Sequence, residues 1–285
     1  MGSQTQSSQL PIVNFGNETM KPGTDTWQRA CQVVREALED HGGFLAIFDK
    51  VTPELDNSIY SAMAELFTLI SDEAKKENTA DKSFDGYVRE LPHLPLFESL
   101  GIGSPFSMEG VHNYSRTIWP EGNDHFCESV NSYAKLVKEL EDMVVRMVFE
   151  SYGLEKQRCD SLLESMDHSL RSYRYREPEM GESNLGLIPH TDATFVWSNG
   201  RIRAGEHQVM MKTKKTRFST GLISHVTKKI EPEEELVDDE HPRLYKSFDN
   251  FDYLPYIFTE EGMKFQGRAR IDAYYRSRQT LADSL

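Results

Sequence analysis

The chain has little cysteine, and the few that it has do not form a recognisable cluster. Its 285 residues include three cysteines, Cys31, Cys127 and Cys159, which lie far apart, with no Cys-x-x-Cys pair. An odd number at wide spacing argues against a disulfide framework and against a zinc cluster. We therefore expect buried, reduced thiols that behave as small apolar side chains.

Basic residues are also in deficit, and long apolar runs are missing. There are 46 acidic against 32 basic residues, a net charge of -14. Such a balance repels nucleic-acid phosphates and anionic lipid. No apolar run approaches the roughly 20 residues of a membrane span, and the first residues lack the charged-then-apolar order of a signal peptide. The sequence thus predicts a cytoplasmic protein without a nucleic-acid or membrane partner.

The residues that are present divide the chain into three regions. Residues 1–9 are polar and rich in Ser and Gln, which predicts a disordered tail. Residues 10–160 are mostly helical in pattern, and residues 161–285 are rich in strand-like segments. Helices followed by strands, without alternation and without internal repeats, indicate an α+β fold rather than a parallel βαβ fold.

The first region begins with a short strand and a capped helix. Thr24 or Asp25 can cap a helix that runs to about His41, where two glycines end it. Residues 44–48 follow as a short buried strand. Residues 71–123 carry Pro and Gly at irregular intervals, and we predict no regular element there.

Two further helices have clear starts. Thr52 caps one, with Pro53 in its first turn, where the missing N–H costs nothing. Asn123 or Asp124 opens the longest helix, which ends at Gly153. Its apolar residues recur every three or four positions, which is typical of a packing face. They are Phe126, Val130, Tyr133, Val137, Leu140, Val144 and Met147.

The last region contains four strand-like segments and one acidic run. The strands are expected at residues 168–175, 186–195, 207–211 and 218–224. The acidic run, 231–240, is most simply a solvated surface stretch.

His190-Thr191-Asp192 and the later His207 could form a metal site. Residues i and i+2 of a strand point to the same face, so the imidazole of His190 and the carboxylate of Asp192 can converge on one ion. By itself such a pair is more often a surface pair. With His207 it would give two histidines and one carboxylate, a facial set that leaves positions open and suits iron(II).

Arg217 and Ser219 form a second candidate pair. They share a strand face, where a guanidinium can grip a carboxylate with two parallel hydrogen bonds and a hydroxyl can add one more. Each motif alone is more often part of an ordinary surface than of a functional site.

Together, these motifs and several other segments resemble one family. The sequence is similar to plant 2-oxoglutarate-dependent dioxygenases, most closely the branch that makes alkenyl and hydroxyalkyl glucosinolate side chains and its auxin-oxidising relatives. The likeness covers nearly the whole chain. It rests on residues 10–13, 37–44, 96–102, 190–192, 198–201, 207–211, 217–222, 234–237 and 240–243.

The resemblance implies an iron(II) centre with His190, Asp192 and His207 as ligands. It implies oxidation of a C–H bond of a small plant specialised metabolite by O2, with release of succinate and CO2 from 2-oxoglutarate. Ascorbate is expected to support the reaction.

The same resemblance implies where 2-oxoglutarate is held. Arg217 and Ser219 look like the pair that binds its distal carboxylate. Tyr175 is similar to a tyrosine that helps to orient it, while Tyr173 stands where the family often has Asn.

One interval departs from the family pattern. Only 14 residues, 193–206, separate Asp192 from His207. In the family this interval is several times longer and carries several strands of the double-stranded β-helix (jelly-roll) core. The chain therefore looks truncated between residues 192 and 198, which predicts an incomplete core. Two hypotheses follow: a working dioxygenase, or a degenerate, non-catalytic family member.

Overall fold

The structure is a computed structural model that describes residues 9–16, 19–78, 85–88, 94–191, 196–247, 249, 253, 255–256, 259–265 and 269–274. The predicted disordered tail, 1–9, lies outside the described residues apart from Gln9.

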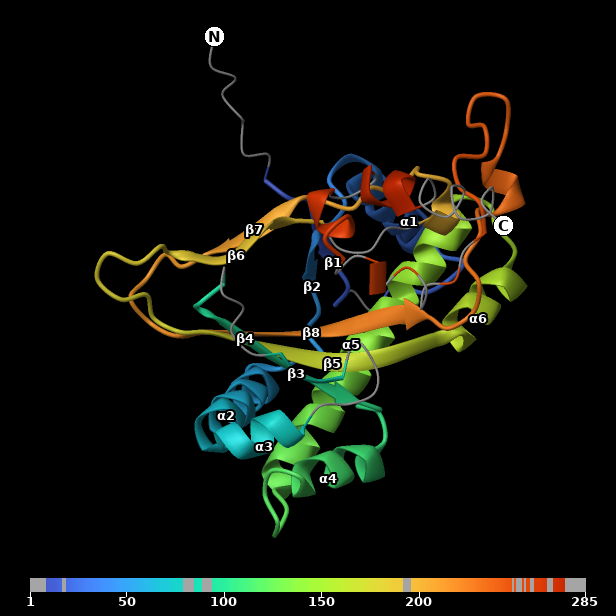
Figure 1. Cartoon of the computed structure of the whole chain (residues 1–285). Coiled ribbons are helices and arrows are strands. Elements are labelled where there is room, and N and C mark those ends of the chain that lie inside the picture. The colour runs from blue at the N-terminus through green and yellow to red at the C-terminus, as the bar shows by residue number, and fades with distance from the viewer. Residues whose placement is uncertain are drawn as a thin grey trace.

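Helices and strands alternate irregularly along the chain (Figure 1). The helices are α1 Asp25–Asp40, α2 Pro53–Leu69, α3 Asp72–Glu77, α4 Met108–Arg116, α5 Asp124–Ser151 and α6 Lys156–Glu164. The strands are β1 Ile12–Asn14, β2 Leu45–Ile47, β3 Gly86–Val88, β4 Phe97–Gly103, β5 Met166–Tyr175, β6 Leu185–His190, β7 His207–Met210 and β8 Arg217–Val226. Short 3-10 turns lie at η1 Val196–Ser198, η2 Glu234–Leu236 and η3 Gly262–Lys264.

The predicted helix starts are confirmed. The Thr24 side chain accepts a hydrogen bond from the Trp27 backbone N–H of α1, at 3.2 Å. Thr52 caps α2 in the same way, and Asn123 caps α5. These oxygens satisfy backbone donors that a helix leaves unpaired in its first turn.

The prediction for residues 71–123 is wrong, because α3, β3, β4 and α4 form there. β4 is buried on both faces along nearly its whole length, so its sequence shows no apolar and polar alternation. α4 is only nine residues long and contains Gly110. Short elements with internal glycines give little periodic signal.

The described strands form three sheets. One is antiparallel with the order β3-β4-β5-β8, one is the antiparallel pair β6-β7, and one is the parallel pair β1-β2. β3 and β4 therefore come from the expected helical region but join the strands of the last region. In Figure 1, β6 and β7 lie over one face of the larger sheet, and helices α2, α3 and α4 lie on the other side.

The short strand expected at residues 44–48 forms as β2, but it is not buried. Leu45 is 50% exposed and Ile47 45% exposed. The flanking Phe44 and Phe48 carry the packing of this segment instead, against the cluster that contains Trp27. Among the described strands β2 pairs with β1 alone, so no second layer covers its side chains.

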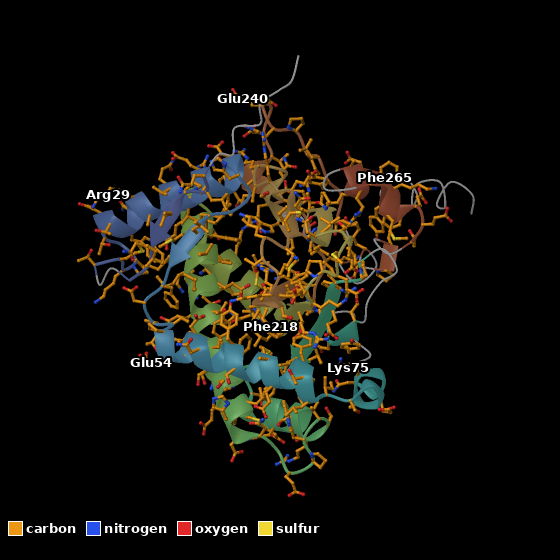
Figure 2. The ribbon with its side chains drawn as sticks, turned by 90° about the vertical axis from the view of Figure 1, so that its left-hand side faces the viewer. Arg29, Glu54, Lys75, Phe218, Glu240 and Phe265 are labelled. Carbon is orange, nitrogen blue, oxygen red and sulfur yellow. The ribbon has the colours of Figure 1, made fainter. Side chains whose placement is uncertain are left out.

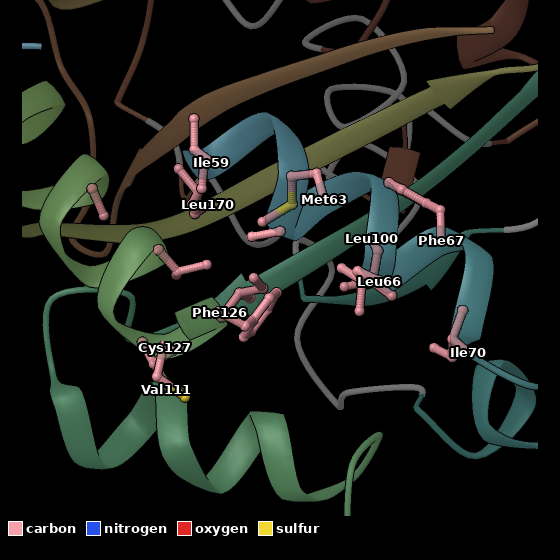
Figure 3. Packing of buried hydrophobic residues seen from close by; sticks show 14 residues of the cluster. Ile59, Met63, Leu66, Phe67, Ile70, Leu100, Val111, Phe126, Cys127 and Leu170 are labelled. Carbon is pink, nitrogen blue, oxygen red and sulfur yellow. The ribbon is translucent and has the colours of Figure 1, made fainter. Parts of the chain in front are cut away.

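The largest core cluster lies between the four-stranded sheet and the helices (Figure 3). It contains Ile59, Met63, Leu66 and Phe67 of α2, Leu100 of β4, Phe126 and Val130 of α5, and Leu170 of β5. Phe218 and Leu222 of β8 pack against it, and Phe218 lies near the middle of the molecule in Figure 2. Because side chains alternate along a strand, the odd-numbered residues of β5 and β8 face away from these helices.

Most acidic residues of the run 231–240 are exposed, as predicted, but the run is also held against the protein. Pro232 and Leu236 within it are buried, and Leu236 belongs to a cluster with residues of α5 and α6. Arg158 of α6 pairs with Glu233 at 2.6 Å and with Glu235 at 3.0 Å. Leu236 and the two ion pairs of Arg158 thus hold the run against α6.

The three cysteines are buried and free, as expected. Burial raises the pKa of the Cys31 and Cys159 thiols to about 11. Within the described ranges, no helix has the length and apolar character that crossing a bilayer requires.

Candidate active site

His190 and His207 occupy facing positions on β6 and β7. Their ring centroids are 4.1 Å apart, with an angle of 52° between the ring planes. The sequence prediction that these side chains converge therefore holds for the two histidines. They lie 17 positions apart in sequence, and only the pairing of β6 with β7 brings them together.

The tautomer of both rings is set by the backbone. Nδ1 of His190 donates to the Ile188 carbonyl oxygen at 2.8 Å, and Nδ1 of His207 donates to the Gly205 carbonyl oxygen at 3.1 Å. A carbonyl oxygen can only accept, so Nδ1 of each ring carries a proton, and Nε2 is the ring nitrogen that would bind a metal. A neutral imidazole with Nδ1–H bonded to a carbonyl is the usual form of a metal ligand. The two histidines thus fit a metal site that uses their Nε2 atoms.

Asp192, the third predicted ligand, lies outside the described residues. In the part of the chain that the structure describes, no group of three His, Cys, Asp or Glu side chains is placed to hold a metal. The metal-ligand role of His190, Asp192 and His207 stays a prediction.

Tyr175 and Arg217 face each other across β5 and β8. The Arg217 guanidinium carbon lies 5.3 Å from the centroid of the Tyr175 ring. Tyr175 is 2% exposed, and burial raises the pKa of its phenol to about 12, although the positive charge of Arg217 acts in the opposite direction. At neutral pH the phenol therefore keeps its proton and can donate a hydrogen bond.

Ser219 lies on the same sheet face as Arg217, directly opposite Tyr173 of β5. Arg217 is exposed, whereas Ser219 and Tyr173 are half-buried. The structure thus gathers all four side chains that the sequence associated with 2-oxoglutarate onto one face of the larger sheet. Their role in binding 2-oxoglutarate stays a prediction.

The two halves of the site are in contact through Tyr175. Its ring packs in one cluster with Leu187 of β6 and Val209 of β7. A Cβ atom at Gly186 would lie 2.9 Å from Cδ1 of Tyr175 and 3.1 Å from Cγ1 of Val209. Only a glycine at position 186 lets β6 approach β5 so closely.

Sequence reasoning missed one residue of this face, Arg171. It is 8% exposed, donates to the Ser99 hydroxyl at 2.8 Å, and has a pKa lowered by burial. Its cross-strand neighbours are Gly101 and Gly221, and a Cβ atom added at Gly221 would meet nothing within 4 Å. The sequence did contain a signal for it. Arg171 lies two positions before Tyr173 on the same strand, so the two side chains are on the same face of the sheet.

The chain is similar to known proteins over most of its length. A probable 2-oxoglutarate-dependent dioxygenase, AOP1 of Arabidopsis thaliana, is 35% identical over 304 residues, which span 90% of this chain and 99% of the relative. The chain belongs to the 2-oxoglutarate-dependent dioxygenase family. A second Arabidopsis member, the 2-oxoglutarate-dependent dioxygenase AOP2, is 38% identical over 188 residues, 65% of this chain and 42% of that protein. No family model matches the chain.

The alignment with the first dioxygenase also bears on length. The alignment is 304 residues long, which is more than the 285 residues of this chain. The relative therefore has residues at positions where this chain has none.

Solved dioxygenase structures share the fold. The structure of AtDAO1, a dioxygenase for auxin oxidation from Arabidopsis thaliana, in its 2-oxoglutarate complex has a TM-score of 0.71 and 24% identity, over 82% of this chain and 100% of that chain. The structure of JOX2 with 2OG, Fe and JA has a TM-score of 0.73 and 19% identity, over 93% of this chain and 89% of that chain. The architecture is therefore that of the iron oxygenases with a double-stranded β-helix.

Proposed function

We propose that this chain is a non-haem Fe(II)- and 2-oxoglutarate-dependent oxygenase that oxidises a C–H bond of a small plant specialised metabolite. The observation that carries the proposal is the histidine pair. Two rings from different strands face each other, and both Nδ1 protons are bonded to backbone carbonyls. Histidines that bind a metal almost always donate their other ring N–H to a carbonyl, a carboxylate or water, and both rings are bonded in this way.

Iron(II) would be held by His190 and His207 through Nε2 and by the carboxylate of Asp192. When bound, the metal would supply the activation of O2 that is coupled to decarboxylation of 2-oxoglutarate to succinate. Two neutral nitrogen ligands and one carboxylate are the set that non-haem iron oxygenases use. Ascorbate would keep the metal in its reduced state.

Arg217 and Ser219 would bind the distal carboxylate of 2-oxoglutarate. The guanidinium offers two parallel donors, the Ser219 hydroxyl a third, and the protonated phenol of Tyr175 lies beside them. Gly186, which touches Tyr175, is four positions from His190, or about 13 Å along β6. A short dicarboxylate aligned with β6 would therefore lie between the anchor and the histidines.

The rest of the molecule is consistent with a small substrate in the cytoplasm. The net charge of -14 disfavours nucleic acid and anionic membranes as partners. A small molecule that binds on the sheet face of Tyr175 and Arg217 requires neither nucleic acid nor a membrane.

The alternative, a degenerate member with an incomplete core, also has support. β6 and β7 form a sheet of only two strands among the described residues, and His207 is exposed. A metal ligand on such a pair lacks the surrounding shell that normally fixes its orientation. In this case the chain would bind 2-oxoglutarate or metal weakly without turnover.

Turnover of 2-oxoglutarate distinguishes the two functions. The purified chain is incubated with Fe(II), ascorbate, O2 and 2-oxoglutarate, and succinate is measured. An oxygenase forms succinate even without its prime substrate, at a slow rate that His207→Ala abolishes. The control His241→Ala changes an exposed histidine bonded to Asp238 and should leave the rate unchanged. Binding of 2-oxoglutarate without any succinate would favour the degenerate alternative.

A further inference from the structure

A buried carboxylate lies behind the end of the sheet that carries Tyr175 and Arg217. Glu98 of β4 is 5% exposed. Its Oε2 accepts hydrogen bonds from the Lys75 ammonium of α3 at 3.2 Å and from the Tyr87 hydroxyl of β3 at 2.6 Å. Its Oε1 pairs with the guanidinium of Arg174 on β5. One side chain thus ties four elements together.

The strand register places this cluster next to Arg217 and Ser219, the proposed anchor of 2-oxoglutarate. Glu98 faces Arg174 across β4 and β5, and Arg174 faces Phe218 across β5 and β8. The next residue on β5 is Tyr175, and the residue before Phe218 on β8 is Arg217. Because side chains alternate between faces, the cluster lies on the helix side while Tyr175 and Arg217 lie on the opposite side.

Arg174 is held on the helix side by α2 as well. Its Nη1 donates to the Phe67 carbonyl oxygen at 3.2 Å, and its guanidinium carbon lies 5.7 Å from the centroid of the Phe67 ring. The Phe67 ring in turn contacts Phe218, with centroids 6.1 Å apart. This end of β5 is therefore held by Glu98 and by α2 through the Arg174 side chain, and β8 contacts α2 here through the Phe218 ring.

We propose that Glu98 is a positioning residue for Arg217: by holding Arg174, it fixes the end of β5 and β8 so that the Arg217 guanidinium stays over the Tyr175 ring. Loss of the buried carboxylate charge would leave the Arg174 and Lys75 cations without their partner, and this end of the sheet would shift. A displacement of about 1 Å is enough to impair a two-pronged contact with a ligand. The expected loss of 2-oxoglutarate affinity rests on the proposed function, whereas the expected movement of the Arg217 guanidinium does not.

The matched comparison is Glu98→Gln with Glu141→Gln. Glu141 of α5 is also a carboxylate on the helix side of β5, where its Oε2 is 2.9 Å from Nε2 of His168. His168 is seven positions from Tyr175, about 23 Å along the strand. Both variants replace one carboxylate on the helix side of the sheet by a neutral amide, but only Glu98→Gln does so behind Arg217 and Tyr175.

Two readouts separate positioning from general destabilisation. The first is the side-chain Nε–H resonance of Arg217 in ¹⁵N-labelled, ligand-free protein, assigned by its absence in Arg217→Lys, because the Tyr175 ring current shifts it. The second is the Kd for 2-oxoglutarate with Mn(II), measured by calorimetry well below the melting temperature. Glu98→Gln should move the Arg217 resonance and raise the Kd at least tenfold, and Glu141→Gln should do neither.

Each outcome decides the proposal. An Arg217 resonance unchanged in Glu98→Gln, or moved equally in both variants, would overturn it. If the unmodified chain binds no 2-oxoglutarate, the proposed function fails, and the Arg217 resonance alone decides the positioning role. Should Glu98→Gln fail to fold, Tyr87→Phe, which removes one donor to the same carboxylate, should give the same shift in smaller measure.

Discussion

The guanidinium of Arg217 lies over the ring of Tyr175, 5.3 Å from the ring centroid, at directly facing positions of β8 and β5. The contact places a permanent cation beside a phenol that burial keeps protonated. It also marks the place where the larger sheet meets β6 and β7, because Tyr175 packs against Val209 and Leu187.

Arg217→Lys should weaken 2-oxoglutarate binding by about tenfold or more, because an ammonium cannot reproduce the two parallel donors of a guanidinium. Binding of the metal should change little, since Arg217 is not among the proposed ligands. Calorimetry with 2-oxoglutarate and with Mn(II) separates the two. Lys215→Ala, an exposed residue between β7 and β8, is the control. An equal loss of both affinities would argue against the anchor role.

His190→Ala and His207→Ala should each remove binding of divalent first-row metals, because either change leaves one imidazole and one carboxylate. In the unaltered chain, metal should raise the melting temperature, and a chelator should lower it again. This response should vanish in both variants and persist in His241→Ala. Retention of full metal affinity in either histidine variant would show that the pair is not the metal site.

Stability should fall in acid partly through Glu141. Burial raises the pKa of this carboxyl, but the hydrogen bond with His168 and the positive charges of His168 and Lys138 outweigh burial, so the net pKa is lowered from the ordinary 4.5. A lowered carboxyl pKa contributes stability that is complete above pH 4.5 and is lost as the pH falls through the folded-state value. The stabilities of the unaltered chain and Glu141→Gln in denaturant melts should therefore differ at pH 7, and the difference should shrink as the pH falls below 4.5 and vanish below the folded-state pKa of Glu141. A constant difference over this range would contradict the assignment.

Leu100→Ala should destabilise the fold by about 2–5 kcal/mol, because it removes a fully buried side chain from the cluster between the sheet and the helices. Leu69→Ala, at an α2 position that is 58% exposed, should change stability by less than about 0.5 kcal/mol. Urea unfolding followed by circular dichroism measures both. Similar losses in the two variants would show that this cluster is not the main core.

Grafting the intervening strands of a related dioxygenase between Asp192 and Ser198 should raise both the melting temperature and the rate of succinate formation. Each added strand would bury alternate apolar side chains, worth about 1.5–3 kcal/mol apiece. It would also pair a strand edge of the β6–β7 sheet that has no neighbouring strand among the described residues. If the short chain melts as high and turns over as fast as the graft, the interval of 14 residues is not a deficiency.

Elements with strong local signals could be predicted from sequence. Thr24, Thr52 and Asn123 begin their helices as expected, because a side-chain cap acts within three residues. β3, β4 and α4 were not predicted, because their stability comes from contacts with distant segments. Glu98 shows the same limit: nothing local indicates that its carboxylate meets Lys75, Tyr87 and Arg174.

The sequence by itself determined the family, the same-face spacing of Arg217 and Ser219, and the choice of His190 and His207 as a candidate pair. Only the tertiary structure decided that these two rings lie 4.1 Å apart, that Tyr175 joins the two sheets, and that Leu45 and Ile47 are exposed. Residue types and their spacing can be recognised from residues that lie within a few positions of one another. Strand pairing and burial depend on which distant segments of the chain come into contact, and the amino-acid sequence alone does not show that.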